Sequence, residues 1–331
     1  MSIPDTVILS RPDNLGDAVL TLPMAGAIKA KAPGTRIIAL VKRYTMPLWV
    51  NCEHVDEVLA LEDLQAAGKG ASELLRKTGA GAIVHVFPHK EVARWAKQAG
   101  IPRRIGTSHR LWHWTTCNER LDFSRKNSDL HEAQLNFKLL APFGIAVPSD
   151  VRSLIPLIGL HLPEPDATVL DQLRTDRLNI ILHPLKVTGA AWGLENFGKL
   201  IRFLDPERYH VLLTGTQAEA DVYRKALPID LAHVTDTGGK LSLTQLMALI
   251  GKADALVAAS TGPLHIAAAA GIRTIGLFNM KRPLHPGRWA PLGADAHVLV
   301  QDTGCPRCAK GEECDCITRI PPERVLDLLP E

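Results

Sequence analysis

Short runs of β-branched and aliphatic residues, each followed by a polar turn and a helical pattern, recur along both halves of this chain. The first run, at residues 6–10, leads into a polar loop at residues 11–16 and a helical pattern over residues 17–32. Strands that alternate with helices at this spacing are typical of a parallel sheet covered by helices. The pattern therefore predicts an α/β fold of Rossmann-like type.

The other expected elements continue the alternation. Apolar runs predict strands, and apolar residues spaced three to four apart predict helices. In the first half we expect strands at residues 36–41 and 82–86, with a helix that runs through Trp95. In the second half we expect strands at residues 178–182, 210–213, 255–258 and 274–278, and helices at residues 195–204, 217–226, 243–250, 264–270 and 321–329.

A proline-rich segment separates the two series. Residues 148–166 contain Pro148, Pro156, Pro163 and Pro165, which break regular structure. We place the linker there and expect two domains, residues 1–160 and 161–331, because 331 residues are comfortable for two. Whether the last helix packs back on the N-terminal domain is left open.

Composition narrows the classes of function. The formal charge of +3 gives no reason to expect a nucleic-acid partner. The longest nearly uncharged stretch, residues 255–272, is interrupted by Ser260, Thr261, Gly262 and Pro263, so it does not predict a membrane span. No signal peptide is expected, because the N-terminus lacks a basic region before an apolar run. We expect a cytoplasmic protein with reduced thiols. The oligomeric state is not readable.

The loop at residues 11–17 ends a strand and begins a helix. Ligands of open α/β sheets bind beyond the carboxyl ends of the strands. Gly16 permits a close approach of substrate, and Asp17 lies in the first helical turn, where the helix terminus stabilises a carboxylate. Asp17 is therefore a candidate general base that faces a cleft, and the alternative is an ordinary helix cap.

A second turn of the same kind begins at Ser260. Ser260, Thr261 and Gly262 join a strand to a helix, with Pro263 in the first turn and His265 soon after. Helix N-terminal amides and a hydroxyl suit a phosphate or pyrophosphate. The alternative is a capped turn with a buried histidine.

Two further loops of the second half follow strands. Lys186 and Thr188 are able to reach a phosphate, unless they lie on a surface loop. Thr214 and Gly215 precede Glu219, which is a candidate for the ribose hydroxyls. A glutamate in a first helical turn more often compensates the helix dipole.

Four of the six cysteines crowd near the C-terminal end, at Cys305, Cys308, Cys314 and Cys316. Four thiolates are able to bind zinc, but the last pair is separated by a single residue, which departs from the usual spacing. We expect reduced thiols in a surface loop, with no metal and no cofactor, and keep a zinc site as the alternative.

Basic residues gather in the first half, with Trp112, His113 and Trp114 nearby. A solvated face is the ordinary interpretation, and an anionic sugar acceptor is the more specific one. The candidates for an acceptor site are Arg11, Asn14, Arg103, Arg104 and Arg110.

Taken in order, these motifs resemble those of glycosyltransferase family 9, the heptosyltransferases. The likeness covers most of the chain and is carried by an ordered set of segments. They are Asn14-Leu15-Gly16-Asp17 with Pro23 six residues later, the histidine-led loop at His183 with Trp192, Thr214-Gly215, Thr261-Gly262-Pro263-Leu264-His265, and the cysteines before Ile320-Pro321-Pro322-Glu323.

The resemblance implies a GT-B fold, with an N-terminal acceptor domain, a C-terminal nucleotide-sugar domain and chemistry in the cleft between them. It implies metal-independent, inverting transfer of a heptose from ADP-heptose to a lipopolysaccharide inner-core sugar, with Asp17 as the general base. The diphosphate would be stabilised by Thr261, Gly262 and the following helix, with help from Lys186 or Thr188. A lipid-anchored acceptor leaves open a peripheral contact with the inner face of the inner membrane.

The chain departs from the family pattern at three places. Ser260 stands where members usually have an aspartate, the lysine that usually precedes the tryptophan of the histidine-led loop is replaced by Ala190 and its neighbours, and Asn279-Met280 replaces a glycine. These changes suggest another nucleotide-sugar donor or a non-catalytic binding homologue as alternatives. A dehydrogenase is disfavoured, because no Gly-any-Gly-any-any-Gly run follows the first strand.

Overall fold

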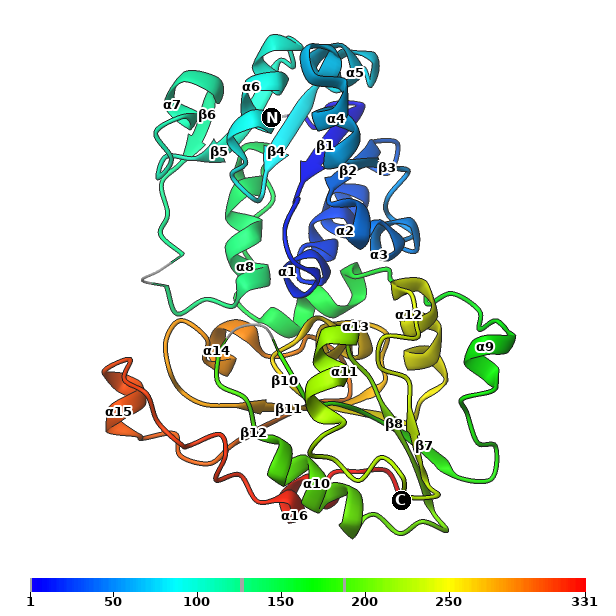
Figure 1. Cartoon of the computed structure of the whole chain (residues 1–331). Coiled ribbons are helices and arrows are strands. Elements are labelled where there is room, and N and C mark those ends of the chain that lie inside the picture. Colours follow the sequence, from blue (N-terminus) through cyan, green and yellow to red (C-terminus); the bar gives the residue numbers. More distant parts are fainter. Residues whose placement is uncertain (1, 126–127, 187–188) are drawn as a thin grey trace. The chain divides into compact units, whose positions relative to one another are not determined.

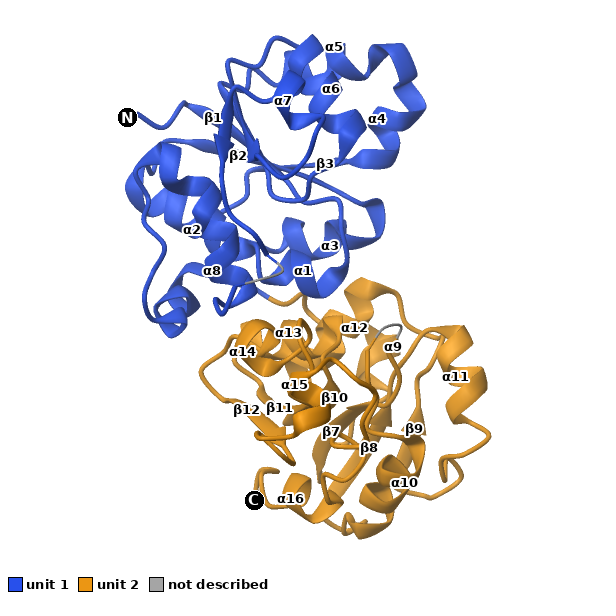
Figure 2. Ribbon diagram, turned by 90° about the vertical axis from the view of Figure 1, so that its left-hand side faces the viewer, with its two compact units in different colours: residues 1–161 blue, residues 162–331 orange. Residues whose placement is uncertain are grey.

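The computed structural model describes residues 2–125, 128–186 and 189–331 and divides into two compact units, Met1–His161 and Leu162–Glu331 (Figure 2). The boundary falls within the proline-rich segment. Within the described residues, no helix combines the length and the apolar composition that crossing a bilayer requires.

The first unit is built on a six-stranded sheet in the order β3-β2-β1-β4-β5-β6 (Figure 1). Every pair of neighbouring strands is parallel, so the carboxyl ends of all six lie at one edge. The central strands are buried apolar runs, as expected for a sheet covered on both faces. The strands are β1 (Thr6–Ser10), β2 (Arg36–Val41), β3 (Glu57–Ala60), β4 (Ala82–His85), β5 (Arg103–Thr107) and β6 (Glu119–Leu121).

The helical pattern over residues 17–32 forms two helices, α1 (Leu15–Val19) and α2 (Leu22–Lys31), where one was expected. Pro23 lies in the first turn of α2, where its missing N–H is tolerated but a continuous helix is not. The Asn136 side-chain amide donates to the Leu20 carbonyl oxygen (3.1 Å) and to Thr21 Oγ1 (3.3 Å), which satisfies the polar groups at the break.

The other helices of the first unit are short and cover the sheet. They are α3 (Met46–Val50), α4 (Leu61–Ala67), α5 (Ala71–Lys77), α6 (Lys90–Gln98), α7 (His113–Thr116), α8 (Glu132–Phe137), and the 3-10 turns η1 (Arg43–Thr45), η2 (Gly68–Gly70), η3 (Lys138–Phe143) and η4 (Val151–Leu157).

Gly26 of α2 lies directly against η4. A Cβ atom at Gly26 would lie 2.2 Å from the carbonyl oxygen of Leu157, a backbone atom that has no side-chain freedom to move away. A glycine is therefore required where the helix and the turn pack together.

The second unit repeats the architecture with the strand order β12-β11-β10-β7-β8-β9, again parallel throughout. Its strands are β7 (Leu178–His183), β8 (Tyr209–Leu213), β9 (Val234–Asp236), β10 (Ala255–Ala259), β11 (Arg273–Phe278) and β12 (Ala296–Val300). Its helices are α9 (Ala167–Leu170), α10 (Leu194–Phe203), α11 (Gln217–Tyr223), α12 (Leu243–Lys252), α13 (Gly262–Ala269), α14 (Pro286–Trp289), α15 (Pro306–Ala309) and α16 (Pro322–Leu326).

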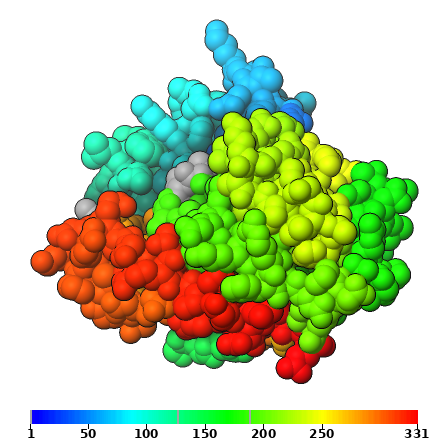
Figure 3. Space-filling model, turned by 60° about the horizontal axis from the view of Figure 1, so that its bottom comes forward, coloured from blue at the N-terminus to red at the C-terminus, as the bar shows by residue number. Residues whose placement is uncertain are grey.

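Helix α16 belongs to the core of the second unit. Val325 and Leu329 are buried there, and α16 packs on α10. The indole N–H of Trp192 donates to the Ile320 carbonyl oxygen at 2.8 Å. Figure 3 shows the C-terminal residues, in red, along the surface beside the green residues of the same unit.

Candidate active site

Asp17 lies where β1 passes into α1, at the carboxyl edge of the first sheet. It occupies the first turn of α1 and forms an ion pair with Arg11. Only 18% of its side chain is exposed. Burial raises the pKa of the Asp17 carboxyl to about 6, against the attraction of Arg11, and the nearby carboxylates of Asp13 and Glu132 raise it further. Asp17 is therefore a carboxylate whose pKa lies near neutrality.

Arg11, which the sequence analysis placed among the acceptor candidates, is held by side chains of its own unit. Its guanidinium is buried, 3.5 Å from Asp13, 3.5 Å from Glu132 and 3.4 Å from Asn136 Oδ1, besides its contact with Asp17. A buried cation needs such partners. Arg11 holds the Asp17 carboxylate in place.

Helix α8 supplies two of these partners. Gln134 Oε1 accepts a hydrogen bond from the His131 N–H at 3.0 Å, and His131 Nδ1 accepts one from the Ala133 N–H at 3.2 Å, which together fix the start of the helix. Glu132 then lies in the first turn, beside Arg11. Sequence reasoning missed Glu132 and Asn136, because no local signal links α8 to the loop at residues 11–17.

His85 is a second group that the sequence interpretation missed. It ends β4, opposite Ser10 of β1, and is fully buried. Burial lowers the pKa of His85 to about 3, so its imidazole is neutral at physiological pH. Neither ring nitrogen has a hydrogen-bond partner among the described residues. A single histidine at a strand end carries no motif by which it could have been found.

Arg103 and Arg104, two further acceptor candidates, do not lie at this edge of the sheet. Both lie at the amino end of β5, whereas ligands of such sheets bind at the carboxyl ends. Arg103 pairs with Glu119 at 2.6 Å, and Arg104 Nε donates to the Thr116 carbonyl oxygen at 2.7 Å. These two arginines hold the outer strand and its turn in place.

Arg110 and Asn14 remain accessible. Arg110 follows the carboxyl end of β5, is exposed, and lies over the Trp112 ring at 5.9 Å from its centroid. Asn14 is the exposed N-cap residue of α1, and its side chain makes no capping hydrogen bond. Both stay candidates for acceptor contacts.

In the second unit, Thr261 is the N-cap residue of α13, and Ser260 separates it from the end of β10. Its hydroxyl oxygen is buried and has no hydrogen-bond partner within the described part of the chain, and it does not cap the helix. Gly262 and Pro263 are the first residues of α13, Ser260 precedes them at intermediate exposure, and His265 is buried one turn later. A hydroxyl and helix N-terminal amides therefore gather at the carboxyl end of β10.

Neighbouring loops at the same edge are held by internal bonds. His183 Nδ1, at the end of β7, lies 3.0 Å from Thr214 Oγ1, which follows β8. The N–H of Thr216 donates to Glu219 Oε2 at 2.7 Å, and the Glu219 N–H donates to Thr216 Oγ1 at 3.3 Å. Glu219 thus forms a capping box at the start of α11. The sequence analysis had offered two roles for this residue, binding of the ribose hydroxyls and compensation of the helix dipole. Gly215 lies against the Glu219 side chain.

Lys186 follows β7 in the next loop. Burial lowers the pKa of the Lys186 ammonium to about 8, and no ion pair to it is found among the described residues. Thr188, the other expected phosphate ligand of this loop, lies outside the described residues.

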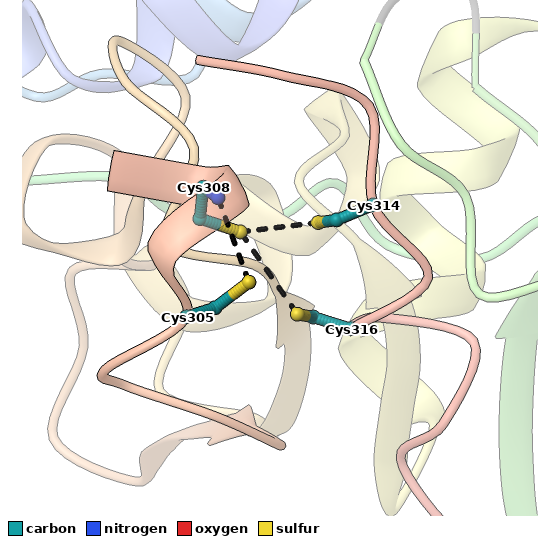
Figure 4. A group of neighbouring side chains, drawn as sticks. All are labelled: Cys305, Cys308, Cys314 and Cys316. Atoms are coloured by element: carbon teal, nitrogen blue, oxygen red, sulfur yellow. Dashed lines mark hydrogen bonds between the residues drawn. The ribbon is translucent and has the colours of Figure 1, made fainter. Parts of the chain in front are cut away.

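The four C-terminal cysteines, expected as reduced thiols in a surface loop, come together and are mostly buried. The sulfur atoms of Cys305, Cys308, Cys314 and Cys316 all lie within 4.8 Å of one another, and only Cys314 is partly exposed (Figure 4). The single residue between the last two cysteines made this convergence hard to foresee.

Comparison with known proteins identifies the family. The sequence model of glycosyltransferase family 9 (heptosyltransferase) matches residues 98–316. A putative glycosyltransferase of Haemophilus influenzae is 24% identical over 327 residues, which cover 92% of this chain and 90% of that protein.

Two solved structures share the fold over nearly the whole chain. A family 9 glycosyl transferase from Veillonella parvula has a TM-score of 0.82 at 16% identity, with 99% of this chain and 98% of that chain covered. The ADP-heptose lipopolysaccharide heptosyltransferase II of Escherichia coli has a TM-score of 0.77 at 19% identity, with 98% and 97% covered. With its two parallel sheets and the matched sequence, this chain belongs to glycosyltransferase family 9.

Proposed function

We propose that this chain transfers a heptose or a related sugar, with inversion, from an ADP-activated donor to an inner-core sugar of lipopolysaccharide. The observation that carries the proposal is the Asp17 carboxylate at the carboxyl end of β1, with a pKa of about 6. A general base works best when its pKa lies near the operating pH.

Asp17 is proposed to take the proton of the acceptor hydroxyl. As the acceptor oxygen bonds to the anomeric carbon, the bond from that carbon to the ADP oxygen breaks, and the proton stays on Asp17 until solvent removes it. Arg11 supports this role because its guanidinium is fixed by Asp13, Glu132 and Asn136 and therefore holds the carboxylate in one orientation.

The second unit is proposed to bind the donor. The departing diphosphate needs positive charge and hydrogen-bond donors. Thr261 offers a buried hydroxyl without a partner among the described residues, the start of α13 offers backbone N–H groups, and Lys186 offers an ammonium. We assign direct diphosphate contacts to these groups. Thr214 and Glu219 then fix the adjacent loops through their internal hydrogen bonds.

Replacement of the base tests the proposal. Asp17→Asn keeps the size of the side chain and removes its basicity, so kcat for ADP release, with ADP-heptose and truncated lipopolysaccharide, should fall by ~10²–10⁴. ADP affinity, measured by calorimetry, should not change. Asp63→Asn, which removes an exposed carboxylate paired with Arg43, is the matched control and should keep wild-type kcat. An Asp17→Asn variant with more than a third of wild-type kcat would refute the role of Asp17 as base.

Ser260 favours a second candidate, a family member with a different nucleotide sugar. A serine at this position has a neutral hydroxyl where the family usually has a carboxylate, so the donor sugar meets different polar groups. Calorimetric titration with ADP-, UDP- and GDP-sugars separates the two. Binding of a uridine or guanosine sugar without binding of the ADP form would replace the heptose donor.

A non-catalytic homologue is the remaining alternative. It predicts that the wild-type protein binds the nucleotide sugar but releases no ADP with any truncated lipopolysaccharide. The reaction as proposed uses no metal ion, so turnover in the presence of a chelator should match turnover without it over the time of an initial-rate measurement.

A further inference from the structure

Four thiol groups from two short segments converge at one end of the second sheet. Cys305 is the N-cap residue of α15 and Cys308 lies within it, while Cys314 and Cys316 come from the chain that follows. Figure 4 shows the four sulfur atoms pointing toward one another. No helix or strand among the described residues places Cys314 and Cys316 next to Cys305 and Cys308, so secondary structure alone does not explain why the four thiols meet.

The distances between the sulfur atoms suit a metal ion better than a disulfide. A tetrahedral ion with metal–sulfur bonds of about 2.3 Å separates its sulfur ligands by about 3.8 Å. Cys308 Sγ lies 3.1 Å from Cys314 Sγ and 4.0 Å from Cys316 Sγ, which brackets that separation. A disulfide requires about 2.05 Å. We propose that Cys305, Cys308, Cys314 and Cys316 bind one divalent ion, Zn²⁺ or Fe²⁺, as a tetrahedral thiolate site.

The surroundings of the cluster favour thiolates over neutral thiols. The Cys308 N–H donates to Cys305 Sγ at 3.5 Å, and Arg319 Nη2 donates to Cys316 Sγ at 3.6 Å. Four thiolates around a divalent ion carry a net charge of about −2, which a neighbouring arginine partly neutralises. These donors are the kind of outer contacts that orient and stabilise metal-bound sulfur.

The segment that carries the cysteines has little else to order it. Its hydrophobic cluster consists of Cys305, Cys308 and Cys316, with Met280 and Cys314 at its margin, and it is separate from the main core of the unit. The helix α15 within it has a single turn. A structural metal site supplies folding free energy where a segment has too few apolar side chains of its own.

The site is structural, because four protein ligands leave no open position for a substrate. It joins the segment to the loop that follows β11. Met280 packs against the sulfur atoms, and Lys281 Nζ lies 2.8 Å from a carboxylate oxygen of Glu313. The ion would therefore fix a loop at the carboxyl edge of the sheet. This role does not depend on which nucleotide sugar binds at that edge.

Metal content of the full-length protein, purified under reducing conditions, tests the proposal directly. Elemental analysis should return about one Zn or Fe per chain. A visible thiolate-to-metal absorption band indicates iron, and a colourless protein with zinc indicates Zn²⁺. Cys308→Ser should lose the metal. Cys117→Ser, which removes a buried thiol of the first unit, is the matched control and should keep it.

A second measurement on wild-type protein covers the case in which Cys308→Ser does not fold. Titration with an organomercurial should release the ion as the four clustered thiols react. Loss of the ion should also speed hydrogen exchange at residues 301–316 more than elsewhere in the unit. Wild-type protein that returns less than about 0.2 metal per chain after reconstitution with Zn²⁺ and Fe²⁺ would overturn the proposal, as would disulfides among the four cysteines in native protein. These readouts are independent of sugar transfer, so failure of the proposed activity would not affect them.

Discussion

The buried Asp17 carboxylate should cost folding stability at the pH at which it acts. Its pKa is about 6 in the folded protein against 3.8 for an unburied aspartate, because burial disfavours the charged form. The folded state therefore binds the proton more tightly than the unfolded state. Stability associated with this group is present below pH 4 and is lost as pH rises through 6.

The magnitude follows from the two pKa values. A difference of about 2.2 pKa units corresponds to about 3 kcal/mol at pH 8, where both states are ionised, and to about 1 kcal/mol at pH 4.5. Asp17→Asn resembles the protonated carboxyl and removes this cost. The variant should therefore be more stable than wild type by up to about 3 kcal/mol at pH 8, with about a third of that gain at pH 4.5.

Thermal unfolding followed by circular dichroism at both pH values measures this difference. A gain of about 3 kcal/mol corresponds to about 6–12 °C in Tm for a unit of this size. Asp63→Asn should shift Tm by the equivalent of less than about 1 kcal/mol at either pH, since exposed ion pairs contribute little. An Asp17→Asn variant that is less stable than wild type at pH 8 would refute this reasoning. It would show that the attraction between Arg11 and the charged carboxylate outweighs the cost of burying that charge.

Two further predictions concern other parts of the chain. The pKa of Lys186, lowered to about 8 by burial, predicts that the Kd for ADP rises up to about tenfold between pH 7 and pH 9. Calorimetry should show this rise in wild type and not in Lys186→Gln, and an identical pH profile in both would remove Lys186 from the donor site. Gly26→Ala should destabilise the first unit by about 1–3 kcal/mol in urea unfolding, because its Cβ meets the Leu157 carbonyl oxygen. Gly34→Ala, with open space around it, should stay within about 0.5 kcal/mol of wild type.

The sequence predicts the centre of each sheet better than its margins. The expected strands at residues 6–10 and 36–41 match β1 and β2 at both ends, since buried parallel strands are uninterrupted apolar runs. The strands β3, β5, β6, β9 and β12 were not foreseen. Four of them are edge strands, and β5 lies next to the edge strand β6. All five have three to five residues with mostly half-exposed side chains, so hydrophobicity marks them weakly.

In the candidate site, the sequence likewise marks residues in local patterns and does not mark contacts between distant residues. Asp17 and Thr261 were predicted as site residues because each lies in a turn between a strand and a helix, and the structure places both in such turns. Glu132 reaches Arg11 from more than a hundred residues away, and no local pattern records that contact. Arg103 was chosen for its charge, and composition does not show at which end of the strands a charged residue lies.

The segment after β12 is anchored at both ends. Val300 closes the last strand of the sheet, and Ile320, Val325 and Leu329 lie in the core of the unit. An engineered chain that stops short of Ile320 would uncover apolar surface on β7 and α10 and leave the cysteines on a free end. Deletion studies of this protein should therefore cut between residues 301 and 315 with a short replacement linker and keep the residues that follow.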